Sequence, residues 1–150
     1  MKTFRFLKLD LTVSCCFFRY SESRQNFLHS CDGSGCGKML IEFQTVRGFP
    51  SEVDIFIAGT VLQYLAIKKQ IVAAWALKSY TENHPAISRG PPFKHPLLNF
   101  IWLLLLAIEQ KETISAFSTL VEKYKPSIQR YELHRLTVRN NNMLRRYIYR

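Results

Sequence analysis

A proline-rich segment past the middle of the chain sets the main limit on the fold. Residues 84–96 read HPAISRGPPFKHP and hold four of the six prolines. Proline lacks a backbone N–H and clashes with the preceding helical turn, so no helix runs through this segment. The residue before a proline also avoids helical geometry, so a helix that precedes Pro85 ends at about Asn83. The sequence predicts a stiff, shaped connection here, unlike a flexible Gly/Ser linker.

Apolar residues recur at helical spacing on both sides of this segment, and glycines and prolines mark where the pattern stops. A capping-box-like start is expected at Ser51, with Asp54 three residues on. No segment shows the period-two alternation of a paired strand. Helices are predicted at Ser21–Ser30, from after Gly33 to Gly48, Ser51–Lys69, Ile71–Asn83, Pro96–Ile108 and Ile114–Tyr124, with Pro126 ending the last.

The run Leu97–Ile108, LLNFIWLLLLAI, is apolar nearly all round. It has twelve residues, whereas a helix needs about 20 to cross a bilayer. We therefore expect it to be the most buried helix of a soluble fold, without stable membrane insertion. The earlier run Leu11–Phe18 is followed by Arg19 rather than by a small-residue cleavage site, so a signal peptide is not expected.

The formal net charge of +10 suggests a nucleic acid or an anionic membrane as a partner, but its distribution argues otherwise. Residues 1–20 carry +3 and residues 129–150 carry +5, whereas residues 21–128 hold eleven basic and nine acidic side chains. The basic character belongs to the ends. No nucleic acid is expected as the main partner, although the arginine-rich end leaves open binding to RNA, to an anionic membrane, or to nothing.

No catalytic or cofactor-binding pattern stands out. GSGCGK at residues 33–38 lacks the first glycine and the final Ser/Thr of a phosphate-binding loop, so it predicts a glycine-rich turn opening a helix. Cys15, Cys16, Cys31 and Cys36 with His29 lack the second ligand pair of a structural zinc site. Reduced thiols fit better than disulfides, because all four cysteines lie in the first quarter of the chain. We expect no enzyme, no metal and no cofactor.

Helices joined by short turns predict an all-α fold of stacked antiparallel helix pairs, which either a bundle or an α-solenoid satisfies. Pro91, Pro92 and Phe93 predict a rigid apolar knob that rims a groove for a partner's helix or strand. The alternative is that Phe93 plugs the core of its own domain.

Three stretches resemble the Golgi-to-ER traffic protein 4 family. They are YSESRQNFLHS at 20–30, DGSGCGKMLIEFQTVRGFPSEVDIFIAGTVLQYL at 32–65, and HPAISRGPPFKHPLLNFIWLLLLAIE at 84–109. The last is the most specific, because GPPF, a short spacer and PLLNFIW form a long and compositionally unusual run. The resemblance covers about residues 20–129 and looks like the C-terminal half of the family.

This resemblance implies a tetratricopeptide-like α-solenoid fragment in the cytosol. It also implies a non-catalytic adaptor in the post-translational targeting of tail-anchored proteins to the ER membrane. The partner of this half would be a ubiquitin-like protein or a BAG-domain scaffold. The family's N-terminal helices, which dock the targeting ATPase, are not expected in this chain, and neither is that docking. The partner-binding role is carried over onto Gly90, Pro91, Pro92, Phe93, Leu97, Leu98, Phe100 and Trp102.

The resemblance divides the chain into three parts: a divergent extension at 1–19, the α-solenoid domain at 20–129, and an arginine-rich tail at 130–150. The helix that the family places after Pro126 is expected to be replaced by this arginine-rich stretch. Two alternatives to an adaptor stay open. The chain is then a basic helical module that binds RNA or anionic membrane through its ends, or a truncated fragment without function.

Overall fold

The computed structural model describes residues 20–135, and every regular element in that range is a helix. The all-α fold class is confirmed, and the solenoid arrangement stays a prediction. The elements are α2 (Tyr20–His29), α3 (Gly33–Arg47), the short 3₁₀ helix η1 (Pro50–Glu52), α4 (Val53–Ala66), α5 (Gln70–Asn83), α6 (Pro96–Glu109), α7 (Ile114–Lys123) and a further helix at residues 125–135.

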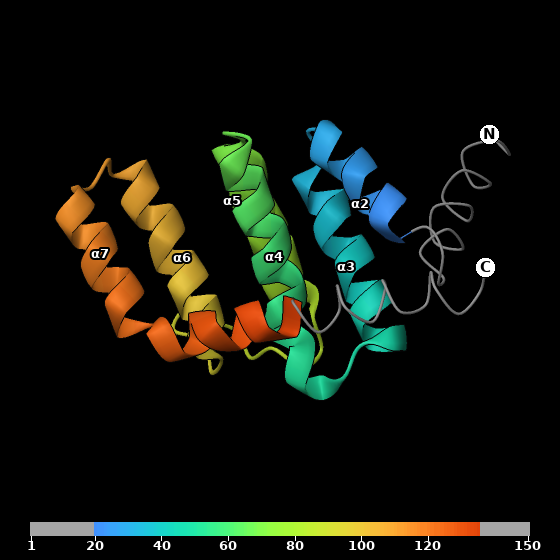
Figure 1. The fold of residues 1–150 in the computed structure, drawn as a ribbon. Helices are drawn as coiled ribbons and strands as arrows, with labels where there is room; N and C mark the ends of the chain where they lie inside the picture. Colours follow the sequence, from blue (N-terminus) through green and yellow to red (C-terminus); the bar gives the residue numbers. More distant parts are fainter. Residues whose placement is uncertain (1–19, 136–150) are drawn as a thin grey trace, which may run out of the picture. The chain divides into compact units, whose positions relative to one another are not determined.

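The chain forms two compact units that meet in sequence at the end of the proline-rich segment, between Lys94 and His95. The first unit contains α2–α5 and most of the proline-rich segment. The second contains α6, α7 and the helix at 125–135. In the first unit α2–α5 lie alongside one another, and in the second α6 and α7 form an antiparallel pair (Figure 1).

Two glycines let α3 cross α5 at very short range. A Cβ on Gly33 would stand 2.3 Å from the carbonyl oxygen of Val72, and one on Gly37 would stand 2.8 Å from that of Ala76. Spaced four residues apart, the two glycines lie on one face of α3, so the backbones approach where other residues would hold them apart. The glycine-rich stretch is therefore a helix start, as predicted, and also a packing surface.

The start of α3 is capped by Asp32, whose Oδ1 accepts a hydrogen bond from the N–H of Gly35 at 2.8 Å. An aspartate in this position satisfies one of the N–H groups that a helix leaves open at its first turn. The sequence predicts a start after Gly33, and α3 begins one residue earlier, at Gly33 itself.

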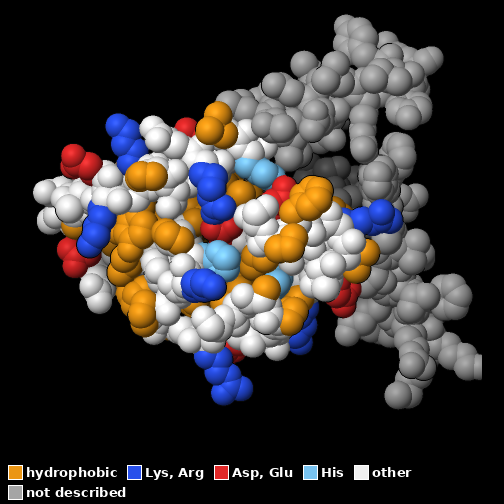
Figure 2. Space-filling model, turned by 90° about the horizontal axis from the view of Figure 1, so that it is seen from below, with side chains coloured by type: hydrophobic (Ala, Val, Ile, Leu, Met, Phe, Trp, Pro, Cys, Tyr) orange, Lys and Arg blue, Asp and Glu red, His pale blue; other side chains and the backbone are white. Residues whose placement is uncertain are grey.

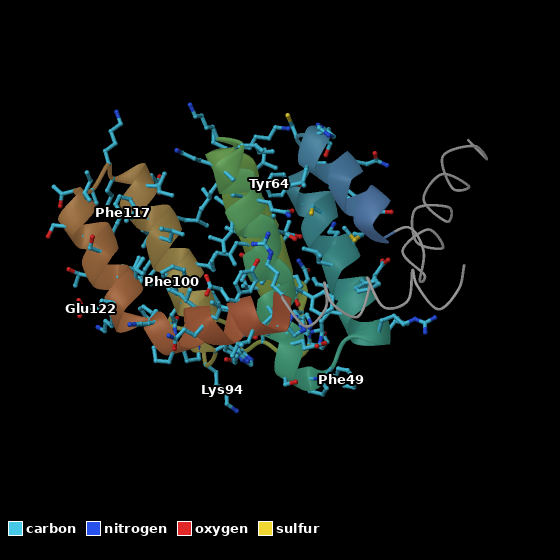
Figure 3. All side chains as sticks on the ribbon, viewed as in Figure 1. Phe49, Tyr64, Lys94, Phe100, Phe117 and Glu122 are labelled. Carbon is cyan, nitrogen blue, oxygen red and sulfur yellow. The ribbon has the colours of Figure 1, made fainter. Side chains whose placement is uncertain are left out.

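The C-terminal end of α2 is held by side chains from farther along the chain. The hydroxyl of Tyr64, on α4, donates to the carbonyl oxygen of Phe27 at 2.9 Å (Figure 3). The ammonium of Lys69 donates to the carbonyls of Leu28 at 2.8 Å and Ser30 at 3.1 Å. A cation beside the last carbonyls of a helix also interacts favourably with the negative end of the helix dipole. These bonds tie α2 to the rest of the first unit.

α4 contributes more buried residues to the first unit than α3 or α5, since nine of its fourteen residues are buried. Burying Tyr64 raises the pKa of its phenol, and a hydrogen bond with Cys36 acts in the same direction. Tyr80, fully buried on α5, donates from its hydroxyl to the carbonyl of Val53 at 2.6 Å and so fixes the start of α4. Buried tyrosines of this kind place an apolar ring in the core and still satisfy their hydroxyl.

The predicted start of the third helix at Ser51 is wrong in its detail. Pro50–Glu52 form the 3₁₀ turn η1, and α4 begins only at Val53. The carboxylate of Glu52 accepts from the N–H of Phe49 at 3.0 Å, so Glu52 supplies the reaching-back bond expected of a capping box. Asp54 lies in the first turn of α4, as expected, and is buried there.

In the second unit the prediction that Leu97–Ile108 forms the most buried helix is wrong. α6 does begin with Pro96 at its first turn, but it buries only Leu97, Leu98, Phe100 and Ile101. Residues 102–108 are half-exposed, and α7 has no buried residue. An apolar composition indicates that a helix can be buried, but it does not show that other helices of this chain pack over all its faces.

The stretch after Pro126 also departs from the expectation. The sequence predicts that the helix there is lost, yet residues 125–135 are helical and continue into the arginine-rich tail. Pro126 ends nothing, because α7 already stops at Lys123 and Pro126 lies in the first turn of the next helix. A proline is tolerated there because the first N–H groups of a helix have no partner within it.

Candidate partner-binding surface

The proline-rich segment is fastened to α3 by a buried polar pair. The Nδ1 atom of His84 accepts from the N–H of Ala86 at 3.1 Å, which leaves the ring proton on Nε2. Nε2 then donates to Oε1 of Gln44 at 2.7 Å. The amide of Gln44 donates in turn to the carbonyl of Phe49 at 3.0 Å. Both side chains are buried, so one continuous set of hydrogen bonds joins α3, the turn before η1 and the start of the proline-rich segment.

Of the four predicted partner-binding residues in this segment, three face the solvent and one does not. Gly90, Pro91 and Pro92 are exposed. Phe93 is only 8% exposed, and its ring lies 3.0 Å from where a Cβ on Gly90 would stand. The peptide bonds before both prolines are cis. Phe93 is therefore the plug of the alternative reading, and the exposed knob consists of the two prolines.

The four predicted residues on α6 also divide by exposure. Leu97, Leu98 and Phe100 are buried, whereas Trp102 is half-exposed. The ring of Phe100 lies 5.9 Å from that of Tyr124, centroid to centroid, a spacing typical of packed aromatic pairs. Trp102 is thus the only one of these four residues that is not buried.

The eight predicted residues fall into separate compact units. Gly90–Phe93 belong to the first and Leu97–Trp102 to the second. In the first unit the group offers the exposed pair Pro91 and Pro92. In the second unit it offers the half-exposed Trp102 on α6. Their role in binding stays a prediction.

Other exposed apolar side chains were missed by the sequence reading. On α5, Ile71 is 76% and Trp75 is 55% exposed. The signal was present in the sequence, because both share a helical face with Lys78 and Glu82, opposite the small buried residues of the same helix. Hydrophobic side chains reach the surface among lysines, arginines and histidines in the space-filling view (Figure 2).

Two kinds of feature bear on metal and membrane binding in the part of the chain that the structure describes: clusters of metal-ligating side chains and helices able to span a membrane. Between residues 20 and 135, no three His, Cys, Asp or Glu side chains gather in a way that would hold a metal ion. Cys31 is exposed and Cys36 buried, both as thiols, while Cys15 and Cys16 lie outside the described residues. Among the described helices, none is both long and apolar enough to cross a membrane.

The arginine-rich tail is described only in its first part. Arg130 and Arg135 lie on the helix at 125–135 and are exposed. The remaining four arginines of the tail, and Asn140–Asn142 between them, lie outside the described residues. The expected extension at 1–19 lies outside them as well.

Comparison with known proteins gives a consistent result. The family model described as Golgi to ER traffic protein 4 matches residues 13–138. The Golgi to ER traffic protein 4 homologs of Xenopus tropicalis and Homo sapiens are each 52% identical over 111 residues, and that of Takifugu rubripes is 53% identical over the same length. Each alignment covers 74% of this chain and 34% of the relative. The chain therefore spans about a third of the length of the curated relatives that it matches.

Proposed function

Because the chain belongs to the Golgi to ER traffic protein 4 family, we propose that it acts as a non-catalytic adaptor in Golgi-to-ER traffic. The more specific role is the targeting of tail-anchored proteins to the ER membrane from the cytosol. This segment's share of that role is to hold a protein partner, either a ubiquitin-like protein or a BAG-domain scaffold. Docking of the targeting ATPase is not assigned to it.

The family match carries this proposal. It runs from residue 13 to residue 138 and so includes both compact units, and about half of the aligned residues are identical to those of vertebrate relatives. An identity this high over both units favours the same helical surfaces in the chain and its relatives. The function itself is an inference from that family, since a fold alone does not specify a function.

Exposure limits which of the eight proposed residues can touch the partner. Gly90, Pro91 and Pro92 in the first unit are accessible, as is Trp102 in the second, and each group would make contacts of its own. The buried members, Phe93, Leu97, Leu98 and Phe100, would act indirectly by holding the segment and α6 in shape. Among accessible residues, tryptophan is the type most often found to dominate the binding energy of an interface.

The proposal is tested by isothermal titration calorimetry of the full chain with two ligands. These are the segments of the ubiquitin-like protein and of the BAG-domain scaffold that bind members of this family. We expect saturable binding that Trp102→Ala weakens about tenfold or more, with the helical content unchanged by circular dichroism. Ile114→Ala, at an exposed apolar position of α7, is the matched control and should bind normally. A folded chain that gives no heat with either segment would contradict the adaptor role.

The arginine-rich tail supports a second candidate function, the binding of RNA or an anionic membrane. Arg130 and Arg135 are exposed on a helix, and the rest of the tail adds four more arginines. Binding through this tail would fall steeply with salt and vanish when residues 130–150 are deleted. An electrophoretic mobility-shift assay with RNA and co-sedimentation with anionic vesicles, each at two salt concentrations, would show which of the two ligands binds.

A further inference from the structure

A groove on the first unit lies between α3 and α5, apart from the eight residues of the proposed partner site. It is a hollow of about 260 Å³ lined by Ser34, Lys38, Trp75, Lys78, Ser79, Glu82 and Asn83. One turn before Trp75, the exposed Ile71 extends its apolar side along α5. The hydroxyl of Ser79 on α5 donates to the carbonyl of Ser34 on α3 at 3.0 Å and so links the two helices that line the groove.

The close crossing of the helices explains why Trp75 is left uncovered. Because Gly33 and Gly37 have no side chains, α3 approaches the backbone of α5 and places no large group over its outer face. Trp75 then stands beside the crossing instead of being buried within it. Ile71 and Trp75 are four residues apart and so form an apolar strip on one face of α5. A helix of a partner can pack along such a strip.

The charges around this strip are mainly positive. Lys38 stands on the α3 wall and Lys78 on the α5 wall, with Glu82 as the single acidic residue in the lining. The ammonium of Lys78 lies 5.4 Å from the centre of the Trp75 ring, a cation–π distance. Lys68 is exposed in the turn before α5, three residues before Ile71. An apolar strip between lysines complements a segment that carries carboxylates beside apolar side chains.

The chain's own ends and a second copy of the chain match this surface poorly. Residues 1–20 carry four basic and one acidic side chain, and residues 136–150 carry four arginines and no acidic side chain. The whole chain has a net charge of +10, so two copies repel each other. The charge balance therefore favours an occupant that is acidic and comes from another protein.

We propose that the groove between α3 and α5 binds an acidic amphipathic helix of another protein. Its apolar side chains cover Ile71 and Trp75, and its carboxylates pair with Lys38 and Lys78. This surface shares no residue with the partner site proposed above, so either can fail without the other.

The test uses the full chain and a synthetic helical peptide with leucines at i, i+4 and i+7 flanked by glutamates, labelled with a fluorophore. Fluorescence anisotropy should show saturable binding. Trp75→Ala should weaken it about tenfold or more, and Lys38→Glu or Lys78→Glu should each weaken it several-fold, with a smaller effect at high salt. The same peptide with lysines in place of glutamates should not bind.

Controls separate loss of the groove from loss of the fold. Ile114→Ala and Lys123→Glu alter exposed residues of α7 and should leave peptide binding unchanged. Each variant should keep its helical content and melting temperature, and Trp75→Phe should keep much of the affinity. Absence of binding, or binding indifferent to Trp75 and both lysines, would overturn the proposal.

A second experiment asks what covers the groove in the free chain. A photo-reactive phenylalanine at position 71 would be cross-linked in the purified chain, with and without the peptide, and the products identified by mass spectrometry. Cross-links to the acidic peptide alone support the proposal. Cross-links to residues 1–19, to residues 136–150 or to a second copy that persist with the peptide present would overturn it.

Discussion

At the scale of single residues, the first unit depends on a small number of buried polar groups. His84 and Gln44 are both buried, and each satisfies the other. Their hydrogen bonds join α3 to the segment that leads away from α5. A buried pair of this kind contributes little net stability when intact, but leaves a costly group unsatisfied when one partner is removed.

Gln44→Leu should therefore lower the free energy of unfolding by about 2 kcal/mol, because it leaves the His84 ring buried without its acceptor. The double variant Gln44→Leu with His84→Phe should cost less than the sum of the two single changes. Urea unfolding followed by circular dichroism measures all three, with Glu42→Gln on the exposed face of α3 as the control. Strict additivity would show that the pair does not act as a unit.

Tyr64→Phe should cost about 1 kcal/mol near pH 8, through loss of the bond to Phe27. Burial raises the pKa of Tyr64 in the folded chain above the ordinary tyrosine value of about 10. The unfolded phenol therefore ionises first as pH rises past 10, which favours unfolding of the wild type but not of the variant. Urea unfolding between pH 8 and 10.5 should show the difference shrinking, and a constant difference would contradict it.

Sequence reasoning at this scale identified residue types correctly but not always their exposure. Phe93 and Trp75 are both aromatic residues beside lysines, yet Phe93 folds back on Gly90 while Trp75 stays exposed. That outcome depends on backbone geometry: a close approach at Gly90 in one case, and the glycine-mediated crossing of α3 and α5 in the other. The approach at Gly90 is not visible in periodicity, whereas the polar face that Trp75 shares with Lys78 and Glu82 is.

At the scale of helices, local chemistry predicted the boundaries well. Helices begin after Asp32 and at Pro96, and one ends at Asn83, as caps and prolines require. The failures lie where a local signal had two readings. Pro126 serves equally as a stop or as a first-turn residue, and the apolar run after Pro96 does not reveal what covers it.

Gly37→Ala tests the crossing of α3 and α5. Alanine favours an isolated helix by about 1 kcal/mol over glycine. Here its Cβ would meet the carbonyl of Ala76 at 2.8 Å and the side chain of Ser79 at 2.9 Å. We expect a net destabilisation of about 1–3 kcal/mol, measured by urea unfolding.

Thr45→Ala, on the exposed face of the same helix, is the control for Gly37→Ala and should be neutral within about 0.5 kcal/mol. A stabilised Gly37→Ala variant would mean that α3 and α5 can separate without cost.

At the scale of the whole molecule, the sequence predicted the fold class and the family, but not how the helices are grouped. The division into two compact units at Lys94 and His95 follows from long-range packing. Periodicity reports only which face of a helix is apolar, not which helix covers it. Nothing in the sequence pattern therefore indicates that the eight residues of the proposed partner site belong to two units.

The whole chain combines a charge of +10 with several exposed large apolar side chains, among them Phe49 and Ile114 (Figure 3 labels Phe49). Charge repulsion should keep it monomeric at low salt, and screening should let it associate as salt rises from about 0.05 to 0.5 M. Light scattering measures this, and a Phe49→Ser, Ile114→Ser double variant should associate less. Association independent of salt would rule out charge as the restraint.

The two tryptophans of the chain fall one in each compact unit, Trp75 in the first and Trp102 in the second. They also differ in exposure, and so their emission spectra and accessibility to a quencher should differ. In two variants that each keep one tryptophan, the fluorescence of that residue therefore reports on one compact unit at a time. Heating them side by side would reveal whether the units melt in one cooperative step or in two, without any added label.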